Sequence, residues 1–130
     1  MREITKTVTI SVDGKSLDFR QTKLDAFSGA SLLRMLSNMP QVSSGDSVMG
    51  FITHLSESDL RSLMVTCLQH CEVLLPAGWM PVMTRGEWSY PELEHDTAVC
   101  LKLTIEEVLW TLEGFFDGGV SASRPEIPGS

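Results

Sequence analysis

The chain has no hydrophobic run long enough to cross a lipid bilayer. A membrane helix needs about 18 to 20 consecutive apolar residues, whereas the 42% hydrophobic and 21% charged residues of this chain are interspersed. Residues 1–6 also lack the apolar stretch of a signal peptide. We therefore expect a protein that stays in the cytoplasm and does not bind a membrane.

Basic residues are also few. Ten Lys and Arg stand against 17 Asp and Glu, which gives a formal net charge of -7, and the basic residues form no cluster. Proteins that bind nucleic acid draw much of their affinity from Lys and Arg that neutralise phosphates. We therefore expect no nucleic acid partner. A basic or hydrophobic protein segment fits the acidic charge better, although the charge is equally compatible with a role in solubility alone.

Cysteine is too scarce for a disulfide framework. The three cysteines are Cys67, Cys71 and Cys100, and a cytoplasmic protein keeps such residues as thiols. Cys67, His70 and Cys71 have the spacing of neighbours on one helix face, but no Cys-x-x-Cys pair completes a tetrahedral metal site. We assign Cys67 and Cys71 to a packed helix face, where cysteine acts as a small hydrophobic residue. We expect neither a metal nor a cofactor.

No group of residues has the pattern of a catalytic site. A cysteine nucleophile needs an imidazole that is held by a third group, and His54, His70 and His95 are scattered along the sequence. Glu106 and Glu107 are expected at the start of a helix, where carboxylates offset the positive end of the helix and are solvated. We expect no glycine-rich loop that binds phosphate, because Asp13-Gly14 has the residues of a turn and Gly118-Gly119 those of a helix end. The sequence therefore predicts a protein that is not an enzyme.

Residues 8–20 have the pattern of a β-hairpin. Apolar and polar residues alternate on both sides of a turn, which is typical of strands with one buried face. The alternating apolar residues are Val8, Ile10, Val12, Leu17 and Phe19. Asp13-Gly14 between them favours the positive φ angles of a two-residue turn.

Three capping patterns predict the starts of helices. In each, Ser or Thr is followed three residues later by an acidic residue: Thr22 with Asp25, Ser56 with Asp59, and Thr104 with Glu107. Residues 48–55 have helical spacing as well. The predicted apolar face of the first helix is Leu24, Phe27, Leu32, Met35, Leu36 and Met39. Because a two-stranded hairpin is marginally stable alone, we expect this helix to lie across its apolar face.

Helical periodicity disappears in residues 72–90, where prolines, glycines and large aromatic residues gather. An Arg85-Gly86 turn allows a second, irregular hairpin, with Pro81 on an edge because proline cannot donate a ladder hydrogen bond. Large apolar side chains in such a segment anchor either a core or an interface. As protein-binding residues we select Trp79, Met80, Met83 and Trp88. Core packing is the alternative for all four.

Together these elements predict a single α+β domain over residues 1–119, in which an N-terminal β-hairpin is packed by several amphipathic helices. Residues 97–103 fit either a strand or a helical turn, since the apolar run is short. Gly118-Gly119 ends the last predicted helix. Residues 120–130 contain two prolines and several small polar residues, which predicts a flexible C-terminal tail.

The hairpin pattern continues directly into a Thr-Lys-Leu-Asp-Ala-Phe helix start. The residues concerned are Ile10, Val12–Lys15, Leu17, Phe19, Arg20 and Thr22–Phe27. Together with several Leu-rich helices in a small acidic protein, this pattern resembles the tail assembly chaperones of long-tailed, non-contractile bacteriophages. Residues 105–116 resemble the late helix of these chaperones more weakly.

The resemblance implies a non-enzymatic chaperone without cofactors. Many copies would coat the tape measure protein, keep its long apolar helix soluble and help to recruit tail-tube subunits before being displaced. It also implies a homo-oligomer in the host cell cytoplasm that is not part of the mature virion. Two alternatives stay open. One is a type III secretion-type chaperone that holds an unfolded effector segment, and the other is a small enzyme with a site built from His95, Cys100 and distant residues.

Overall fold

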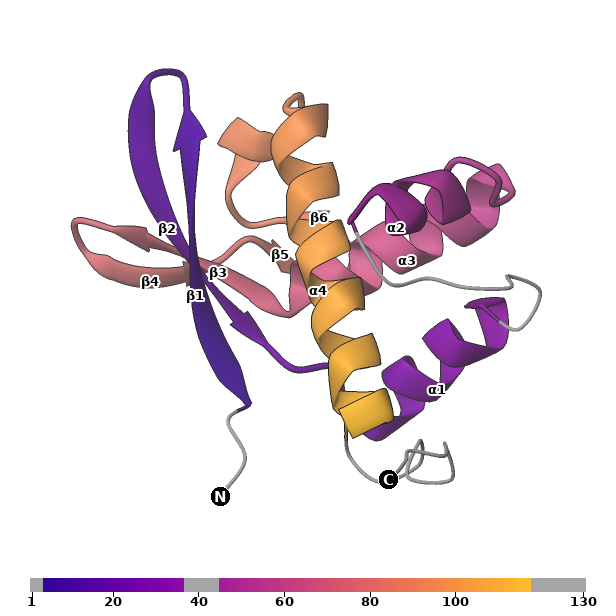
Figure 1. Cartoon of the computed structure of the whole chain (residues 1–130). Helices are drawn as coiled ribbons and strands as arrows, with labels where there is room; N and C mark the ends of the chain where they lie inside the picture. The colour runs from indigo at the N-terminus through magenta and orange to yellow at the C-terminus, as the bar shows by residue number, and fades with distance from the viewer. Residues whose placement is uncertain (1–3, 37–44, 118–130) are drawn as a thin grey trace.

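The structure of the chain, a computed structural model, describes residues 4–36 and 45–117. In chain order its elements are β1 (Thr5–Val12), β2 (Lys15–Thr22), α1 (Ala26–Leu36), α2 (Gly45–Ile52), α3 (Glu57–Gln69), β3 (Cys71–Leu75), β4 (Gly78–Pro81), β5 (Met83–Thr84), β6 (Glu87–Trp88), the 3-10 helix η1 (Pro91–Leu93) and α4 (Thr97–Asp117). Figure 1 shows strands β1–β4 on one side of α4 and helices α1–α3 on the other. The predicted α+β class is confirmed.

Strands β1 to β4 form one antiparallel sheet in that order. The predicted hairpin pairs β1 with β2 over their full length. Asp13 and Gly14 have φ angles of 53° and 79°, which is the left-handed geometry of a two-residue primed turn. β2 then pairs with β3, and β3 with β4. Residues 71–81 thereby extend the N-terminal hairpin into a four-stranded sheet.

The second hairpin predicted in residues 72–90 is present as β5 and β6, a separate two-stranded sheet. Its turn is the predicted Arg85-Gly86 pair, with φ angles of 53° and 79°. Pro81 lies on β4, an edge strand of the main sheet. The predicted edge position of this proline is therefore confirmed, because an edge strand has a side that needs no ladder hydrogen bonds.

The first helix begins later than its capping pattern predicts. Thr22 is the last residue of β2, and its N–H donates to the His70 carbonyl oxygen at 2.8 Å. This hydrogen bond to the α3–β3 junction holds Thr22 in extended geometry, so Thr22 does not cap a helix. Asp25 caps α1 instead, because its Oδ2 accepts from the Ser28 N–H at 3.2 Å.

The buried face of α1 differs from the predicted one. Phe27, predicted in the core, is 87% exposed, whereas Leu32 is 2% exposed. Leu32 and the half-buried Met35 pack with α2, α3 and α4 and not with the hairpin. The predictions that Phe27 is buried and that α1 lies across the hairpin are therefore wrong. Met39, assigned to the same face, lies outside the described residues.

Helices α3 and α4 cover the apolar face of the sheet. The cluster that joins them to it is Ile10, Phe19, Leu68, Cys71, Val73, Val82, Met83, Tyr90, Leu93, Val99, Cys100 and Leu103. A second cluster joins α1, α2, α3 and α4 and consists of Leu32, Val48, Phe51, Ile52, Leu63, Cys67, Val108 and Leu112. Because α4 contributes to both clusters, it holds the sheet and the other helices together, as its central position in Figure 1 shows.

The predicted cap of α3 is confirmed. Ser56 Oγ accepts from the Asp59 N–H at 3.1 Å, and α3 begins at the next residue, Glu57. The predicted cap of the last helix is wrong. Thr104 lies inside α4, where its buried hydroxyl donates to the carbonyl oxygen of Cys100 at 2.9 Å. Residues 97–103 are therefore the first turns of one long helix and not a strand.

The predicted Gly118-Gly119 stop and the predicted C-terminal tail lie outside the described residues, as do residues 37–44. Across residues 4–36 and 45–117, no helix is both long and apolar enough to span a membrane.

Candidate functional site

The four residues selected as protein-binding anchors occupy different environments. Met83 is 5% exposed and belongs to the core beneath the sheet. Met80 and Trp88 are half-buried and pack against the same cluster. Trp79 is half-buried on β4, where it lies opposite Leu74. Burial removes Met83 from the candidate contact residues, and a binding role for the other three stays a prediction.

Trp79 lies on the outer face of the sheet, next to Arg20. The Arg20 guanidinium carbon is 4.4 Å from the centroid of the Trp79 ring. Its Nε and Nη2 donate to Glu72 Oε1 at 2.8 Å and 2.6 Å. Leu74 beside them is 41% exposed. We call these four residues the outer sheet patch. A planar guanidinium held between a carboxylate and an aromatic ring fixes the ring in place, so the patch is pre-organised for contact.

The most exposed large apolar side chain among the described residues is Phe27, at 87%. It lies in the first turn of α1, one helical turn before Ser31 and two before Arg34, so these three residues share one side of the helix. Isolated apolar residues are common on protein surfaces, but a phenyl ring exposed to this extent leaves unrealised roughly 2 kcal/mol of burial free energy. A partner that covers the ring would gain that free energy.

An open groove begins where this side of α1 continues. Its volume is about 700 Å³, and it is lined by Ser31, Arg34, Met35, Phe51, His54, Leu55, Ser56 and Asp59. The lining combines apolar side chains from α1 and α2 with polar groups at the start of α3. Phe27 lies one helical turn before Ser31, the groove residue nearest to it along α1. We call Phe27 and the groove together the α1 surface.

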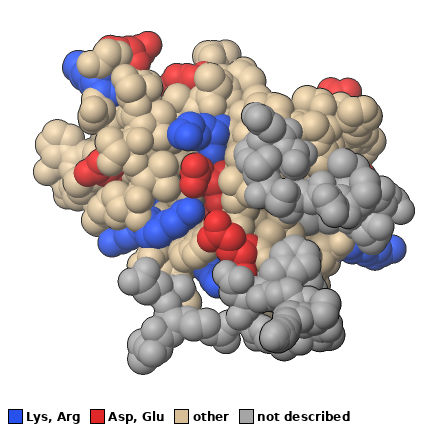
Figure 2. Space-filling model, in the orientation of Figure 1, with Lys and Arg blue, Asp and Glu red and all other residues tan. Residues whose placement is uncertain are grey.

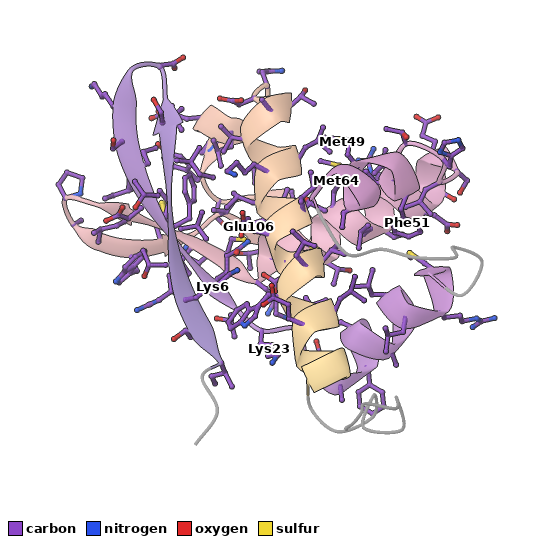
Figure 3. All side chains as sticks on the ribbon, in the orientation of Figure 1. Lys6, Lys23, Met49, Phe51, Met64 and Glu106 are labelled. Atoms are coloured by element: carbon purple, nitrogen blue, oxygen red, sulfur yellow. The ribbon has the colours of Figure 1, made fainter. Side chains whose placement is uncertain are left out.

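Lysines of the hairpin region contact α4 at the surface. Lys6 Nζ is 3.4 Å from Glu106 Oε1 and 5.0 Å from the centroid of the Trp110 ring. Lys23 Nζ is 5.7 Å from the same centroid. Figure 3 shows both lysines beside α4 near Glu106, and Figure 2 shows acidic and basic side chains adjacent near the middle of this face. Each such contact contributes at most about 1 kcal/mol, so these groups attach the hairpin to α4 mainly in combination.

Glu107, the next residue of α4, is fully buried. Both of its carboxylate oxygens lack a hydrogen-bond partner among the described residues, as do the buried Gln21 Oε1 and Thr111 Oγ1. The prediction that Glu107 is solvated at a helix start is therefore wrong. Because α4 begins at Thr97, Glu107 falls in the middle of the helix and on its inner side.

Burial raises the pKa of Glu107 to about 8, and the charge of Lys6 opposes this shift only in part. The carboxyl group is therefore mostly protonated at neutral pH. Burial also raises the pKa of Cys71 to about 12 and that of Cys100 to about 11. Since the thiolate is the reactive form of cysteine, burial keeps these thiols in their unreactive form at neutral pH.

The candidate metal ligands do not share a helix face. Cys67 lies on α3, whereas Cys71 is the first residue of β3. The ring of His70, between them, donates from Nδ1 to the Thr66 carbonyl oxygen at 2.7 Å, and its Nε2 is 3.4 Å from Asp25 Oδ1. Within the part of the chain that the structure describes, no three His, Cys, Asp or Glu side chains are grouped to hold a metal ion.

The prediction that Phe27 is a core residue overlooked a signal in the sequence. Asp25 followed three residues later by Ser28 is itself a capping arrangement, and it starts the helix at Ala26. A helix of 3.6 residues per turn places Phe27 roughly 140° from Leu32 around the axis, wherever the helix begins. The two side chains therefore belong to different faces.

Comparisons of the chain with known protein families, with curated proteins and with solved structures find no match.

Proposed function

We propose that this chain is a non-enzymatic phage tail assembly chaperone, which binds the tape measure protein and helps to recruit tail-tube subunits. The resemblance of residues 10–27 to such chaperones is the basis of the proposal. These residues span the turn of the hairpin, β2 and the start of α1. In this role the chain acts in the host cell cytoplasm as a homo-oligomer and leaves before the virion is complete.

The observation that carries the proposal is the 87% exposure of Phe27 beside an open groove. A client helix with an apolar face binds by placing its side chains in a groove and against an aromatic anchor. The α1 surface supplies both elements, because the half-buried Met35 and Leu55 line the groove and Phe27 lies one helical turn before its Ser31. The tape measure protein, as a long apolar helix, is a client of that kind.

A co-expression experiment tests this assignment. We expect the wild-type chain to increase the soluble fraction of a tape measure protein and to co-purify with it. Phe27→Asp should weaken binding by about 30-fold, because loss of an interface anchor costs about 2 kcal/mol or more. Co-purification of Phe27→Asp at the wild-type level would contradict the assignment of this surface.

A matched control separates binding from folding. Ala98 is exposed at the second position of α4, which is the position that Phe27 occupies in α1. Ala98→Asp therefore adds the same charge at an equivalent helix position and should leave client binding unchanged. Both variants should unfold within about 0.5 kcal/mol of the wild type, since substitutions at exposed sites have small effects.

A further inference from the structure

β1 is a long edge strand of the main sheet, and no other strand of the described residues covers its outer side. In the order β1-β2-β3-β4, the outer strands are β1 and β4. β4 has four residues and ends in Pro81, whereas β1 has eight residues, no proline and an unbroken register with β2. Monomeric proteins protect such edges with proline, charge or a bulge. The one charged residue of β1 is Lys6, and its ammonium group contacts Glu106 on α4 at 3.4 Å.

Alternate residues of β1 direct their backbone groups away from the sheet. In a hairpin with a two-residue turn, the two residues that flank the turn form backbone hydrogen bonds to each other. The backbone N–H and C=O groups of Val12 and of the other even-numbered residues of β1 therefore form hydrogen bonds to β2. The Lys23 N–H, which donates to the Ile4 carbonyl oxygen at 2.7 Å, fits this alternation. The odd-numbered residues, all exposed, are Thr5, Thr7, Thr9 and Ser11. Across the described ranges no strand pairs with their side of β1.

We propose that a second copy of this chain pairs with β1, antiparallel and around a two-fold axis at Val8. This register places Thr5 opposite Ser11, and Thr7 opposite Thr9, of the second copy. Each of these residues then exchanges backbone hydrogen bonds with its partner. Thr and Ser pairs on adjacent strands are also favourable. The two sheets of four strands become one continuous sheet.

The side chains of β1 favour a second copy over another partner. A two-fold contact requires one surface to be complementary to itself, and in this register Ile4, which is 62% exposed, lies opposite Val12 of the second copy. Opposed residues that share no backbone hydrogen bonds bring their side chains closest together. The second copy therefore covers Ile4, the apolar residue that the monomer exposes at the end of β1.

Charge also favours pairing between copies along β1. Each chain carries a net charge of -7, so two copies associate best where acidic groups are few. β1 contains no acidic residue, and the nearby Asp18 carboxylate accepts from Thr9 Oγ1 at 2.6 Å. In Figure 1 β1 lies in front of β3 and β4, and α1 is on the other side of α4. Pairing through β1 therefore leaves Phe27 accessible to a client.

Self-association belongs to the proposed function, but the β1 pairing requires no client. Its test therefore uses the purified chain without a client. If the purified chain does not pair through β1, the proposed β1 contact is wrong, but client binding by the α1 surface is not affected. If the co-expression experiment fails, the proposed client binding is wrong, but the β1 contact is not affected.

Disulfide cross-linking tests the register. Val8→Cys places two thiols opposite each other across the axis, in a non-bonded pair whose spacing suits a disulfide. Mild oxidation should convert most of this variant to a covalent dimer that reductant reverses. Val12→Cys is the control, because Val12 is half-buried on the same strand but lies opposite Ile4. The native thiols Cys67, Cys71 and Cys100 are buried and should not react. Equal cross-linking of both variants, or none of Val8→Cys, would overturn the proposed register.

Sedimentation equilibrium tests the contact without a cross-link. Thr7→Pro removes an outward N–H from each copy while the bonds to β2 remain, so the dissociation constant should rise by about tenfold or more. Thr7→Val keeps that N–H and should dimerise like the wild type. A wild-type chain that stays monomeric at all concentrations, or a Thr7→Pro variant that dimerises normally, would overturn the proposal.

Discussion

Glu107→Gln should stabilise the protein strongly at alkaline pH and only slightly at acidic pH. Burial raises the pKa of Glu107 in the folded chain from 4.5 to about 8. The folded state therefore binds more protons than the unfolded state between these two values, and wild-type stability falls as the pH rises through this window. Ionising the buried carboxyl costs roughly 4 to 5 kcal/mol in total. Gln has nearly the same shape and does not ionise.

Thermal melts at pH 5.5 and pH 8.5 measure this effect. The stability gap between Glu107→Gln and the wild type should grow by roughly 3 kcal/mol between the two conditions, which corresponds to roughly 10 °C in Tm. Glu106→Gln is the control, because it removes the neighbouring carboxylate, whose side chain is 30% exposed and paired with Lys6. A gap that grows equally in both variants would show that the burial of Glu107 is not the cause.

Phe19→Ala should remove a large part of the stability of the fold. Phe19 is fully buried in the cluster that joins the hairpin to α3 and α4. Truncation of a buried Phe costs about 3 to 5 kcal/mol, against a total of about 5 to 15 kcal/mol for a typical domain. Urea unfolding should therefore shift to a much lower midpoint.

The control for this prediction is Leu74→Ala, on the opposite face of the sheet. Leu74 is 41% exposed, so its truncation should cost about 1 kcal/mol or less. A Phe19→Ala midpoint as close to the wild type as that of Leu74→Ala would show that the hairpin does not depend on this cluster.

Local sequence signals predicted the turns better than the long-range pairing. Asp13-Gly14 and Arg85-Gly86 both adopt the positive φ angles that their residue types favour. The pairing of β2 with β3, in contrast, brings Gln21 opposite Cys71. No periodicity within either segment encodes this contact between distant parts of the chain. The four-stranded sheet was therefore not predictable from the sequence patterns.

The capping patterns show how tertiary contacts override local preference. Ser56 caps α3 as predicted, since its side chain is exposed and free to accept from Asp59. Thr22 and Thr104 have the same pattern, but Thr22 is held in β2 by the His70 carbonyl oxygen and Thr104 is enclosed within α4. The error at Glu107 follows from the early start of α4, which places this residue in the middle of the helix. The error at Phe27 has another cause, because Phe27 lies roughly 140° from Leu32 wherever the helix begins.

The proposed chaperone role is tested most directly by the number of copies of this chain that bind to a tape measure protein. Light scattering of purified complexes would compare a tape measure segment with a segment of twice its length. A chaperone that coats its client should bind about twice as many copies to the longer segment, because each copy covers a fixed length of helix. A copy number that stays the same for both lengths would contradict the coating role and would fit a chaperone that holds one defined segment.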